Sequence, residues 1–235
     1  MIKSRKELFD NLICEVGICT KCLNIKAEKN DKSLYNVYKD FNVGRCIPSI
    51  WTDWYNRLDA KIMVIGQDWG PYEDMLKLNK QYMLDKREDN WYKLIESEKS
   101  MTKKKLTKFL VDSSKGKISN IDNVFITNAI MCARSGTNYR GDNINLKYST
   151  CACSNYLKRQ IDIVDPKVIV TLGYYPLLAL SNIFGFTVES NLTKTIENNP
   201  VIKVDNYIIV PAFHPAAQIS LERQTKQYKK IWDNM

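Results

Sequence analysis

Residues 153–173 have the sequence CSNYLKRQIDIVDPKVIVTLG, and this stretch decides the expected fold. Apolar side chains recur at helical spacing over residues 153–164, and Pro166 marks the end of the predicted helix. Residues 167–172 form a β-branched apolar run that Gly173 closes, which is typical of a buried parallel strand. A helix followed directly by a buried strand is a unit of an α/β fold.

The same pattern recurs along the rest of the chain. Further core strands are predicted at residues 61–65, 123–127 and 207–210. Residues 201–204 and 207–210 flank the turn signal Asp205-Asn206, and we take the second run as the fourth core strand. Helices are predicted near residues 8–13 and at 91–98, 103–111, 153–164, 176–184 and 219–233.

These elements predict an α/β protein, a three-layer α/β/α sandwich with a central four-stranded, mainly parallel sheet. We expect residues 1–235 to form one domain, in which residues 1–58 are an N-terminal segment with loops. Ligands of such sheets bind beyond the carboxyl ends of the strands, so the residues that follow each strand are the candidates for a functional site.

Composition narrows the class of protein and its partners. The chain has 235 residues and 44% hydrophobic residues, enough for a buried core. Neither an apolar run long enough for a membrane span nor a secretory signal is present, so we expect a cytoplasmic protein with no membrane partner. Lysine and arginine number 35 against 26 acidic residues, a net charge of +9. Such a charge favours DNA as a partner, provided that folding gathers it; a basic proteome background is the alternative.

Polar residues follow three of the four predicted strands. Asp68 lies among glycines after the first, Asn128 follows the second, and His214, the only histidine, follows the fourth. A carboxylate can activate water or stabilise a cation, and an amide can recognise the edge of a nucleobase. A histidine can donate to a developing anion. Each residue alone also fits an ordinary role as a helix cap, a turn residue or a surface group.

Several motifs resemble the uracil-DNA glycosylase superfamily. Residues 65–68, Ile-Gly-Gln-Asp, resemble the start of the water-activating motif of one branch, in which Pro-Tyr follows. Residues 213–217, Phe-His-Pro-Ala-Ala, resemble the second glycosylase motif. Residues 126–132 and 153–173, with the segment 18–23, are similar to the iron–sulfur (family 4-like) branch, which the chain resembles most.

The resemblance implies a role for each of these residues. Asp68 and His214 are the implied catalytic residues: Asp68 activates water or stabilises the cation, and His214 donates to uracil O2 as the base leaves. Gly66, Gln67, Trp69 and Asn128 are the implied substrate-binding residues, with the Gln67 backbone amide at O2 and Asn128 on the O4/N3 edge. The implied DNA-contacting residues are Ala216, Ala217, Gln218 and Ile219, although Gln218 and Ile219 could instead begin the last helix.

The chain also departs from both branches of the family. The iron–sulfur branch usually has Gly-Glu-Ala-Pro-Gly in the first motif, whereas residues 66–70 are Gly-Gln-Asp-Trp-Gly. The aromatic residue that stacks on the base is not identified, and Trp69, Tyr72 and Trp91 are candidates that could equally lie in the core or at the rim.

Seven cysteines in a chain expected in the cytoplasm argue against a disulfide framework. Cys19 and Cys22 form a C-x2-C pair, a moderate signal for a metal or redox site. The resemblance adds Cys132 and Cys153, which makes a four-thiolate set for a 4Fe–4S cluster in which residues 1–58 take part. Zinc on the same thiolates, or reduced packing cysteines, are the alternatives. Three cysteines remain. Cys151 could replace Cys153 as a ligand, and Cys14 and Cys46 are expected to be spare.

Three functions are compatible with these features. The first is a monomeric DNA glycosylase of base-excision repair, which removes uracil or another deaminated base. The second is a non-catalytic iron–sulfur protein of the same fold that binds nucleic acid. The third is a different α/β enzyme acting on a nucleotide or small molecule. This hypothesis is the weakest of the three, because no Gly-x-Gly-x-x-Gly motif and no P-loop follow any predicted strand.

Overall fold

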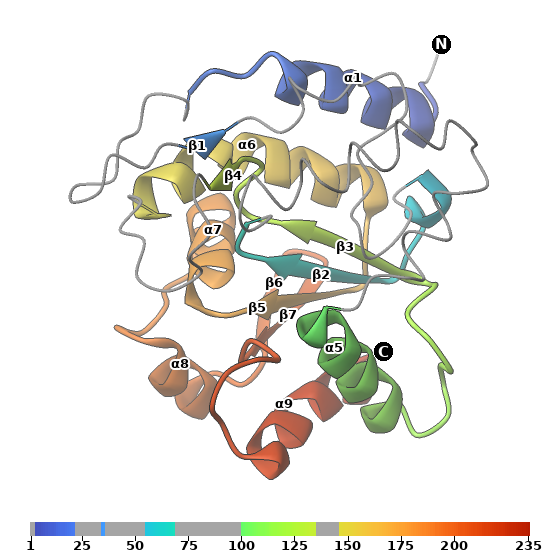
Figure 1. Cartoon of the computed structure of the whole chain (residues 1–235), viewed down its shortest axis with the longest axis vertical. Coiled ribbons are helices and arrows are strands. Elements are labelled where there is room, and N and C mark those ends of the chain that lie inside the picture. The colour runs from blue at the N-terminus through green and yellow to red at the C-terminus, as the bar shows by residue number, and fades with distance from the viewer. Residues whose placement is uncertain (1–2, 22–33, 36–54, 69–99, 135–145) are drawn as a thin grey trace.

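The protein is represented by a computed structural model that describes residues 3–21, 34–35, 55–68, 100–134 and 146–235 (Figure 1). The predicted helix at residues 91–98 lies outside these ranges. A central sheet runs through the described part of the chain, and helices cover both of its faces (Figure 1).

The central sheet has five strands in the order β3-β2-β5-β7-β6. Their bounds are β2 (Ile62–Gly66), β3 (Val124–Asn128), β5 (Val168–Leu172), β6 (Ile202–Val204) and β7 (Tyr207–Ala212). Four of these strands are parallel to one another, and β6 pairs antiparallel with β7. The α/β class with a mainly parallel sheet is therefore confirmed, whereas the predicted count of four strands is wrong. The run at 201–204 forms a fifth, edge strand because the turn at Asp205-Asn206 folds it back on β7.

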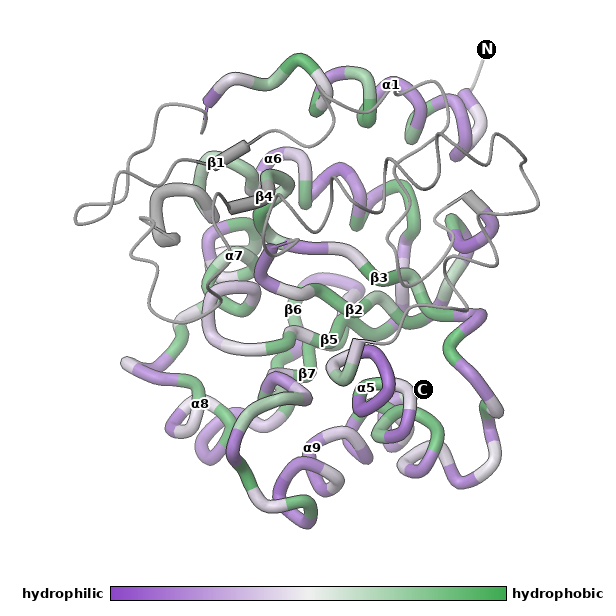
Figure 2. The backbone as a smooth tube through the Cα atoms, in the orientation of Figure 1, coloured by the Kyte–Doolittle hydropathy of each residue, from purple (hydrophilic) through white to green (hydrophobic). Residues whose placement is uncertain are grey.

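Alternation along the strands divides the core into two hydrophobic clusters. On one face, Met63, Ile65 and Ile169 pack under α1 (Arg5–Gly17), α6 (Leu146–Val164) and α7 (Tyr174–Phe184). On the other face, Val64 and Val170 pack under α5 (Met101–Ser113) and α9 (Leu221–Asp233). The hydropathy-coloured tube shows the strands as the apolar centre (Figure 2).

The helix predictions hold for the described residues, with shifted ends. The predicted helix at 153–164 begins earlier, at Leu146, and the one predicted at 219–233 begins at Leu221. Three further elements were not predicted from the sequence: the helix α8 (Leu192–Asn198), and the two-residue strands β1 (Leu34–Tyr35) and β4 (Ala133–Arg134), which pair with each other. A short 3₁₀ helix, η1 (Tyr55–Arg57), precedes β2.

Helix α1 is tied to the sheet and to α6. Ser4 caps its start, and the Phe9 ring packs edge-on against Phe125 with centroids 6.0 Å apart. Arg5 donates to the carbonyl of Leu58, at 2.9 Å. Glu15 at its other end forms an ion pair with Arg159 of α6. The N-terminal helix thus has a fixed place beside α6.

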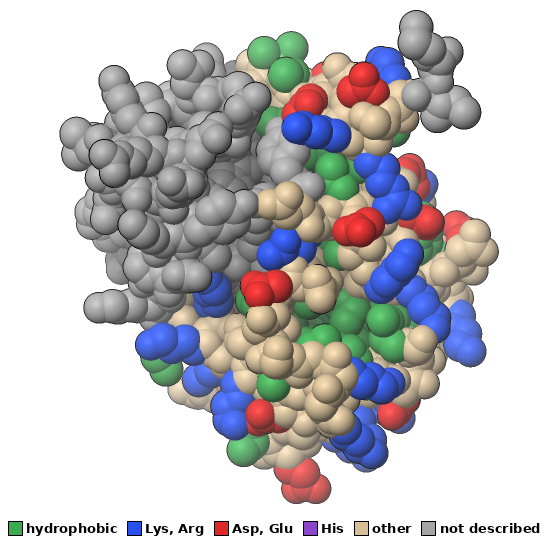
Figure 3. All heavy atoms as spheres, turned by 90° about the vertical axis from the view of Figure 1, so that its right-hand side faces the viewer, with side chains coloured by type: hydrophobic (Ala, Val, Ile, Leu, Met, Phe, Trp, Pro, Cys, Tyr) green, Lys and Arg blue, Asp and Glu red, His purple; other side chains and the backbone are tan. Residues whose placement is uncertain are grey.

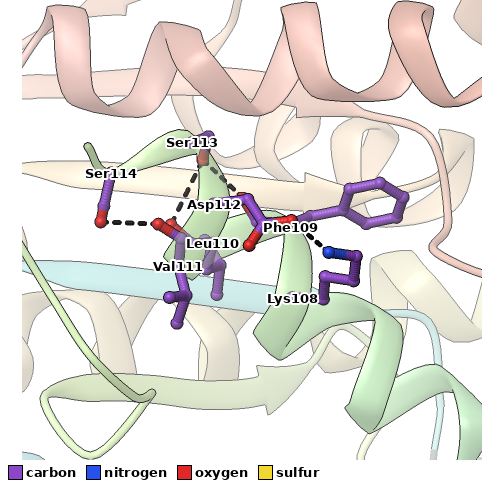
Figure 4. A network of polar contacts seen from close by, with 7 residues as sticks. All are labelled: Lys108, Phe109, Leu110, Val111, Asp112, Ser113 and Ser114. Atoms are coloured by element: carbon purple, nitrogen blue, oxygen red, sulfur yellow. Dashed lines mark hydrogen bonds and ion pairs between the residues drawn. The ribbon is translucent and has the colours of Figure 1, made fainter. Parts of the chain in front are cut away.

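Helices α5 and α9 are joined to each other on the opposite face. The Phe109 and Tyr228 rings stack with centroids 5.0 Å apart. The Trp232 indole donates to the Ser113 hydroxyl at 2.9 Å, while Ser113 itself donates to the Phe109 carbonyl within the last turn of α5 (Figure 4). These contacts hold α9, which follows the predicted His214 motif, against the sheet.

None of the helices in the described ranges is both long and apolar enough to cross a membrane. The face of the molecule seen in Figure 3 carries lysine and arginine side chains spread among acidic and uncharged ones. Among the described residues on this face, the basic side chains are not gathered into one patch.

Candidate active site

The carboxyl ends of β2 and β3 bring two of the predicted residues together. Gly66 is the register partner of Asn128, and the Ala129 amide donates to the Gly66 carbonyl at 2.8 Å. A Cβ atom placed on Gly66 would lie 2.4 Å from Oδ1 of Asn128. The Asn128 side chain therefore occupies the space that the missing side chain of Gly66 leaves open.

Gln67 and Asp68 continue from β2 beyond the edge of the sheet. The Gln67 side-chain amide donates to Oδ2 of Asp68 at 2.8 Å, and the Ile130 amide donates to the Gln67 carbonyl at 2.9 Å. Both residues are half-buried. The first bond orients the Asp68 carboxylate, and the second holds this segment against the chain that follows Asn128.

His214 follows β7 after the buried Phe213. Although part of the His214 surface is exposed, the surrounding protein desolvates the ring and lowers its pKa from the ordinary value. The Asp68 carboxylate raises this pKa, by less than desolvation lowers it. The two predicted catalytic residues are therefore near enough to interact electrostatically. The Ala216 amide donates to Nδ1 at 3.2 Å, and this bond assigns the proton of a neutral imidazole to Nε2.

The residues after His214 form a turn that leads into α9. The Ala217 amide donates to the His214 carbonyl at 2.8 Å, and the Ile219 amide donates to the Ala217 carbonyl at 2.9 Å. Ser220 caps α9, so Gln218 and Ile219 belong to the loop and not to the helix. Ala216 and Gln218 are exposed, and Ala217 and Ile219 are partly so. All four are open to contact from outside.

The remaining predicted site residues are treated in two groups. Trp69, Tyr72 and Trp91, the candidates for base stacking, lie outside the described residues. The strand end at Gly173 leads directly into α7, and the Tyr174 hydroxyl donates to the carbonyl of Glu189. In the described part of the chain, the end of β5 therefore serves to start α7.

Two of the predicted cysteine ligands, Cys19 and Cys153, lie close enough to Cys132 to affect the pKa of its thiol. Burial, together with the neighbouring Cys153 and Cys19, raises the pKa of the Cys132 thiol to about 12. Burial and a hydrogen bond with Cys19 raise the pKa of Tyr156 of α6 to about 12 as well. The thiols come from the end of α1, from the segment after β3 and from α6. Segments distant in the sequence therefore meet at one place.

The described residues do not form a complete metal centre. Among them, no three histidine, cysteine, aspartate or glutamate side chains are grouped so as to hold a metal ion, and the expected ligand Cys22 lies outside them. Cys151 is exposed and accepts a hydrogen bond from Asn182 of α7 at 3.2 Å, whereas Cys153 is buried. Cys14 is exposed and Cys46 lies outside the described residues.

Two buried glutamines that support the site were not predicted to do so. Gln160 of α6 accepts a hydrogen bond from Thr127, the residue before Asn128, at 2.7 Å. Gln227 of α9 donates to the carbonyl of Pro211, near the end of β7, at 2.6 Å. Gln160 lies in the stretch that matches the iron–sulfur branch, but nothing in the sequence indicated its partner. No sequence signal pointed to Gln227.

An α/β fold with a carboxylate, an amide and an imidazole beyond the carboxyl ends of parallel strands defines a class of proteins that bind their ligand at this edge. Residues 52–235 match the model of the uracil DNA glycosylase superfamily, and the chain belongs to that superfamily.

A similar curated protein is the Type-4 uracil-DNA glycosylase of Sulfurisphaera tokodaii, with 38% identity over 100 residues. The matched region is 42% of this chain and 43% of that protein, so the similarity spans less than half of the relative's length. It agrees with the predicted resemblance to the family 4-like branch.

Proposed function

We propose that this protein is a DNA glycosylase that hydrolyses the N-glycosidic bond of uracil, or of another deaminated base, in DNA. The observation that carries the proposal is that Asn128, Asp68 and His214 lie at or just after the carboxyl ends of three parallel strands of one sheet, in a chain of this superfamily. A base must leave the DNA stack to reach such a site.

In the proposed complex, Asn128 distinguishes uracil from cytosine. Its amide can donate to O4 and accept from N3–H, a pattern that cytosine does not offer. Gly66 supports this role because it leaves room for the Asn128 side chain. The backbone amide of Gln67 is the proposed donor to O2, and the Gln67 side chain is already engaged with Asp68.

The bond from C1′ of the sugar to N1 of the base breaks with its electron pair moving onto the base, while positive charge develops on the sugar. Asp68 stabilises that charge and orients the water that attacks C1′; as the water oxygen bonds to C1′, the water passes a proton to the Asp68 carboxylate. Neutral His214, with its proton on Nε2, donates a hydrogen bond to O2 of the departing anion.

We further propose that Cys19, Cys22, Cys132 and Cys153 hold a 4Fe–4S cluster, with zinc as the alternative. The donor set fits because thiolates suit iron–sulfur clusters and zinc, and because Cys19 and Cys153 both raise the pKa of the Cys132 thiol. When bound, the cluster would join α1, the segment after Asn128 and α6. Its role in the proposal is structural.

DNA is the proposed partner, with Ala216, Ala217, Gln218 and Ile219 as the contacting loop. Their exposure beside His214 and the net charge of +9 support this assignment. We take the protein to act as a monomer in the cytoplasm, which gel filtration and cell fractionation would check.

A second candidate function is a non-catalytic iron–sulfur protein that binds nucleic acid. The observation in its favour is the altered first motif, in which Trp69 stands where the Gly-Gln-Asp branch has proline. Binding of DNA without base release would favour this candidate over the enzyme.

One assay separates the two functions. The purified, metal-loaded protein is incubated with labelled oligonucleotides that contain uracil, hypoxanthine or xanthine, and alkali then cleaves any abasic site. We expect cleavage of at least one substrate and a loss of about 10²–10⁴-fold in Asp68→Asn. Absence of cleavage on all three substrates by folded protein would refute the glycosylase proposal, and an unchanged rate in Asp68→Asn would remove Asp68 from the mechanism.

A further inference from the structure

Two prolines, Pro200 and Pro211, lie just beyond the last paired residues of the antiparallel strand pair β6–β7. Its register pairs Ile202 with Ile209 and Val204 with Tyr207. Continuation of this register by two residues brings Pro200 opposite Pro211. In an antiparallel hairpin with a two-residue turn, residue pairs alternate between hydrogen-bonded and non-hydrogen-bonded ones, and the pair next to the turn is hydrogen-bonded. Counted from Val204–Tyr207, the Pro200–Pro211 pair is therefore one at which a regular ladder would form two hydrogen bonds.

Neither proline has a backbone N–H, so neither of these two bonds can form. The carbonyls of Pro200 and Pro211 would therefore lack ladder partners at a place where Pro211 is buried. The side-chain amide of Gln227 supplies both donors: Nε2 lies 2.8 Å from the Pro200 carbonyl and 2.6 Å from the Pro211 carbonyl. Gln227 itself is 4% exposed, which makes these bonds costly to lose.

The position of this amide bridge relates it to the site. Pro211 lies three residues before His214, and the opposite side of β7 is held by the Gly173 amide, which donates to the Ala212 carbonyl at 2.9 Å. The Tyr228 hydroxyl, one residue after Gln227, lies 3.4 Å from the Phe213 carbonyl. One face of α9 thus contacts the backbone up to the residue before His214.

We propose that Gln227 is a positioning residue for His214: its amide replaces the two missing ladder bonds between Pro200 and Pro211 and so fixes the end of β7 from which His214 projects. The catalytic consequence rests on the proposed glycosylase function. The structural consequence does not, because it concerns only the orientation of the imidazole.

The test uses the single histidine of the chain as a probe. In 15N-labelled protein, the imidazole signals report the tautomer and the pKa of His214 without interference from other histidines. The test variant is Gln227→Met, which keeps the length of the side chain and removes both donors. Ser113→Ala in α5 is the matched control, because it removes the buried hydrogen bond from Trp232, which lies near the C-terminal end of the helix that carries Gln227.

We expect Gln227→Met to lower the fraction of the Nε2–H tautomer and to reduce kcat by roughly 10- to 100-fold, with a smaller change in KM. Ser113→Ala should change stability alone. A His214 signal and kcat in Gln227→Met that match those of Ser113→Ala would overturn the proposal. The two proposals can fail separately. If the wild type has no glycosylase activity but Gln227→Met still changes the His214 signal, the enzyme function is refuted and the positioning role is retained.

A second substitution keeps the test valid if Gln227→Met folds poorly. Pro200→Val restores a backbone N–H opposite the Pro211 carbonyl, so the double variant Pro200→Val/Gln227→Met should recover part of the wild-type His214 signal and of kcat. Failure of the folded double variant to recover any of either would contradict the bridging role.

Discussion

At the scale of single residues, the space between Gly66 and Asn128 decides how the proposed base-recognising amide is placed. A Cβ at Gly66 would overlap Oδ1 of Asn128 at 2.4 Å, and that oxygen is the end of a side chain that can rotate away. We expect Gly66→Ala to displace the amide while the sheet remains intact. The expected result is a loss of roughly 10²-fold in kcat/KM on uracil-containing DNA with little change in melting temperature.

Gly116 offers the matched control for this substitution. It has a φ of +87° and no atom within 4 Å of a Cβ placed on it. Gly116→Ala should therefore cost about 1 kcal/mol of folding stability through backbone strain and leave kcat/KM unchanged. Equal activity of Gly66→Ala and Gly116→Ala would show that the placement of Asn128 does not matter for the reaction.

His214 leads to a prediction about pH. Burial lowers its pKa in the folded protein, whereas the unfolded chain retains the ordinary value near 6.5. Between these two values the unfolded chain binds more protons, so stability should fall as the pH drops below about 6.5 and through the folded pKa. Protonation of Nδ1 would also break its bond with the Ala216 amide.

NMR titration of the imidazole checks this prediction directly. The apparent pKa should lie below 6.5, and Asp68→Asn should lower it further, because the carboxylate favours the charged ring. An apparent pKa above 6.5, or one that rises in Asp68→Asn, would be inconsistent with the desolvated neutral imidazole on which the proposed mechanism relies.

At the scale of the elements, two threonines flank β2 at the same level of the sheet. Thr127 of β3 and Thr171 of β5 are both register partners of Ile65, and both are buried. Thr127 donates to Gln160 of α6, whereas the Thr171 hydroxyl has no hydrogen-bond partner within the described residues. The two neighbours of β2 thus present one hydroxyl with a hydrogen-bond partner and one without such a partner in the described part of the chain.

The substitution of each threonine by valine should therefore have opposite results. Thr127→Val should cost about 1–3 kcal/mol, because it leaves the Gln160 oxygen buried without its donor. Thr171→Val should be neutral or stabilising, since the hydroxyl that it removes has no partner among the described residues. Urea unfolding of both variants measures the difference, and equal free energies of unfolding would show that the Thr127–Gln160 bond contributes nothing.

At the scale of the whole molecule, the proposed cysteine ligands come from segments that the sequence keeps more than 100 residues apart, from Cys19 to Cys153. If they hold the proposed cluster, Cys19→Ser and Cys153→Ser should lose iron, visible absorption and thermal stability. Cys14→Ser should retain all three, because that exposed thiol is expected to be spare. Iron analysis of anaerobically purified protein makes the measurement.

Two outcomes would change the assignment of the ligands or of the metal. Iron retained in Cys153→Ser but lost in Cys151→Ser would exchange these two residues. A colourless wild-type protein that contains zinc would replace the cluster by the alternative metal.

Much of this arrangement could be predicted from local sequence. The apolar runs before Gly66, Asn128 and His214 identify buried strands, because only a strand covered on both faces is apolar at consecutive positions. Chain order and the carboxyl-edge rule then place the three residues at one edge. The edge strand β6 was not counted because its side chains are only partly buried, and its pattern is correspondingly mixed.

The sequence by itself determined the α/β class, the mainly parallel sheet and the residues that follow its strand ends, because local patterns of apolar residues indicate strand burial and the chain order of strands and helices indicates parallel strands. Only the tertiary structure decided which side chains support that edge. The Asn128 amide fits because Gly66 faces it, and Gln227 bridges Pro200 and Pro211 from a helix that starts ten residues after Pro211. Such contacts depend on the packing of distant elements, and no local pattern of residues specifies them.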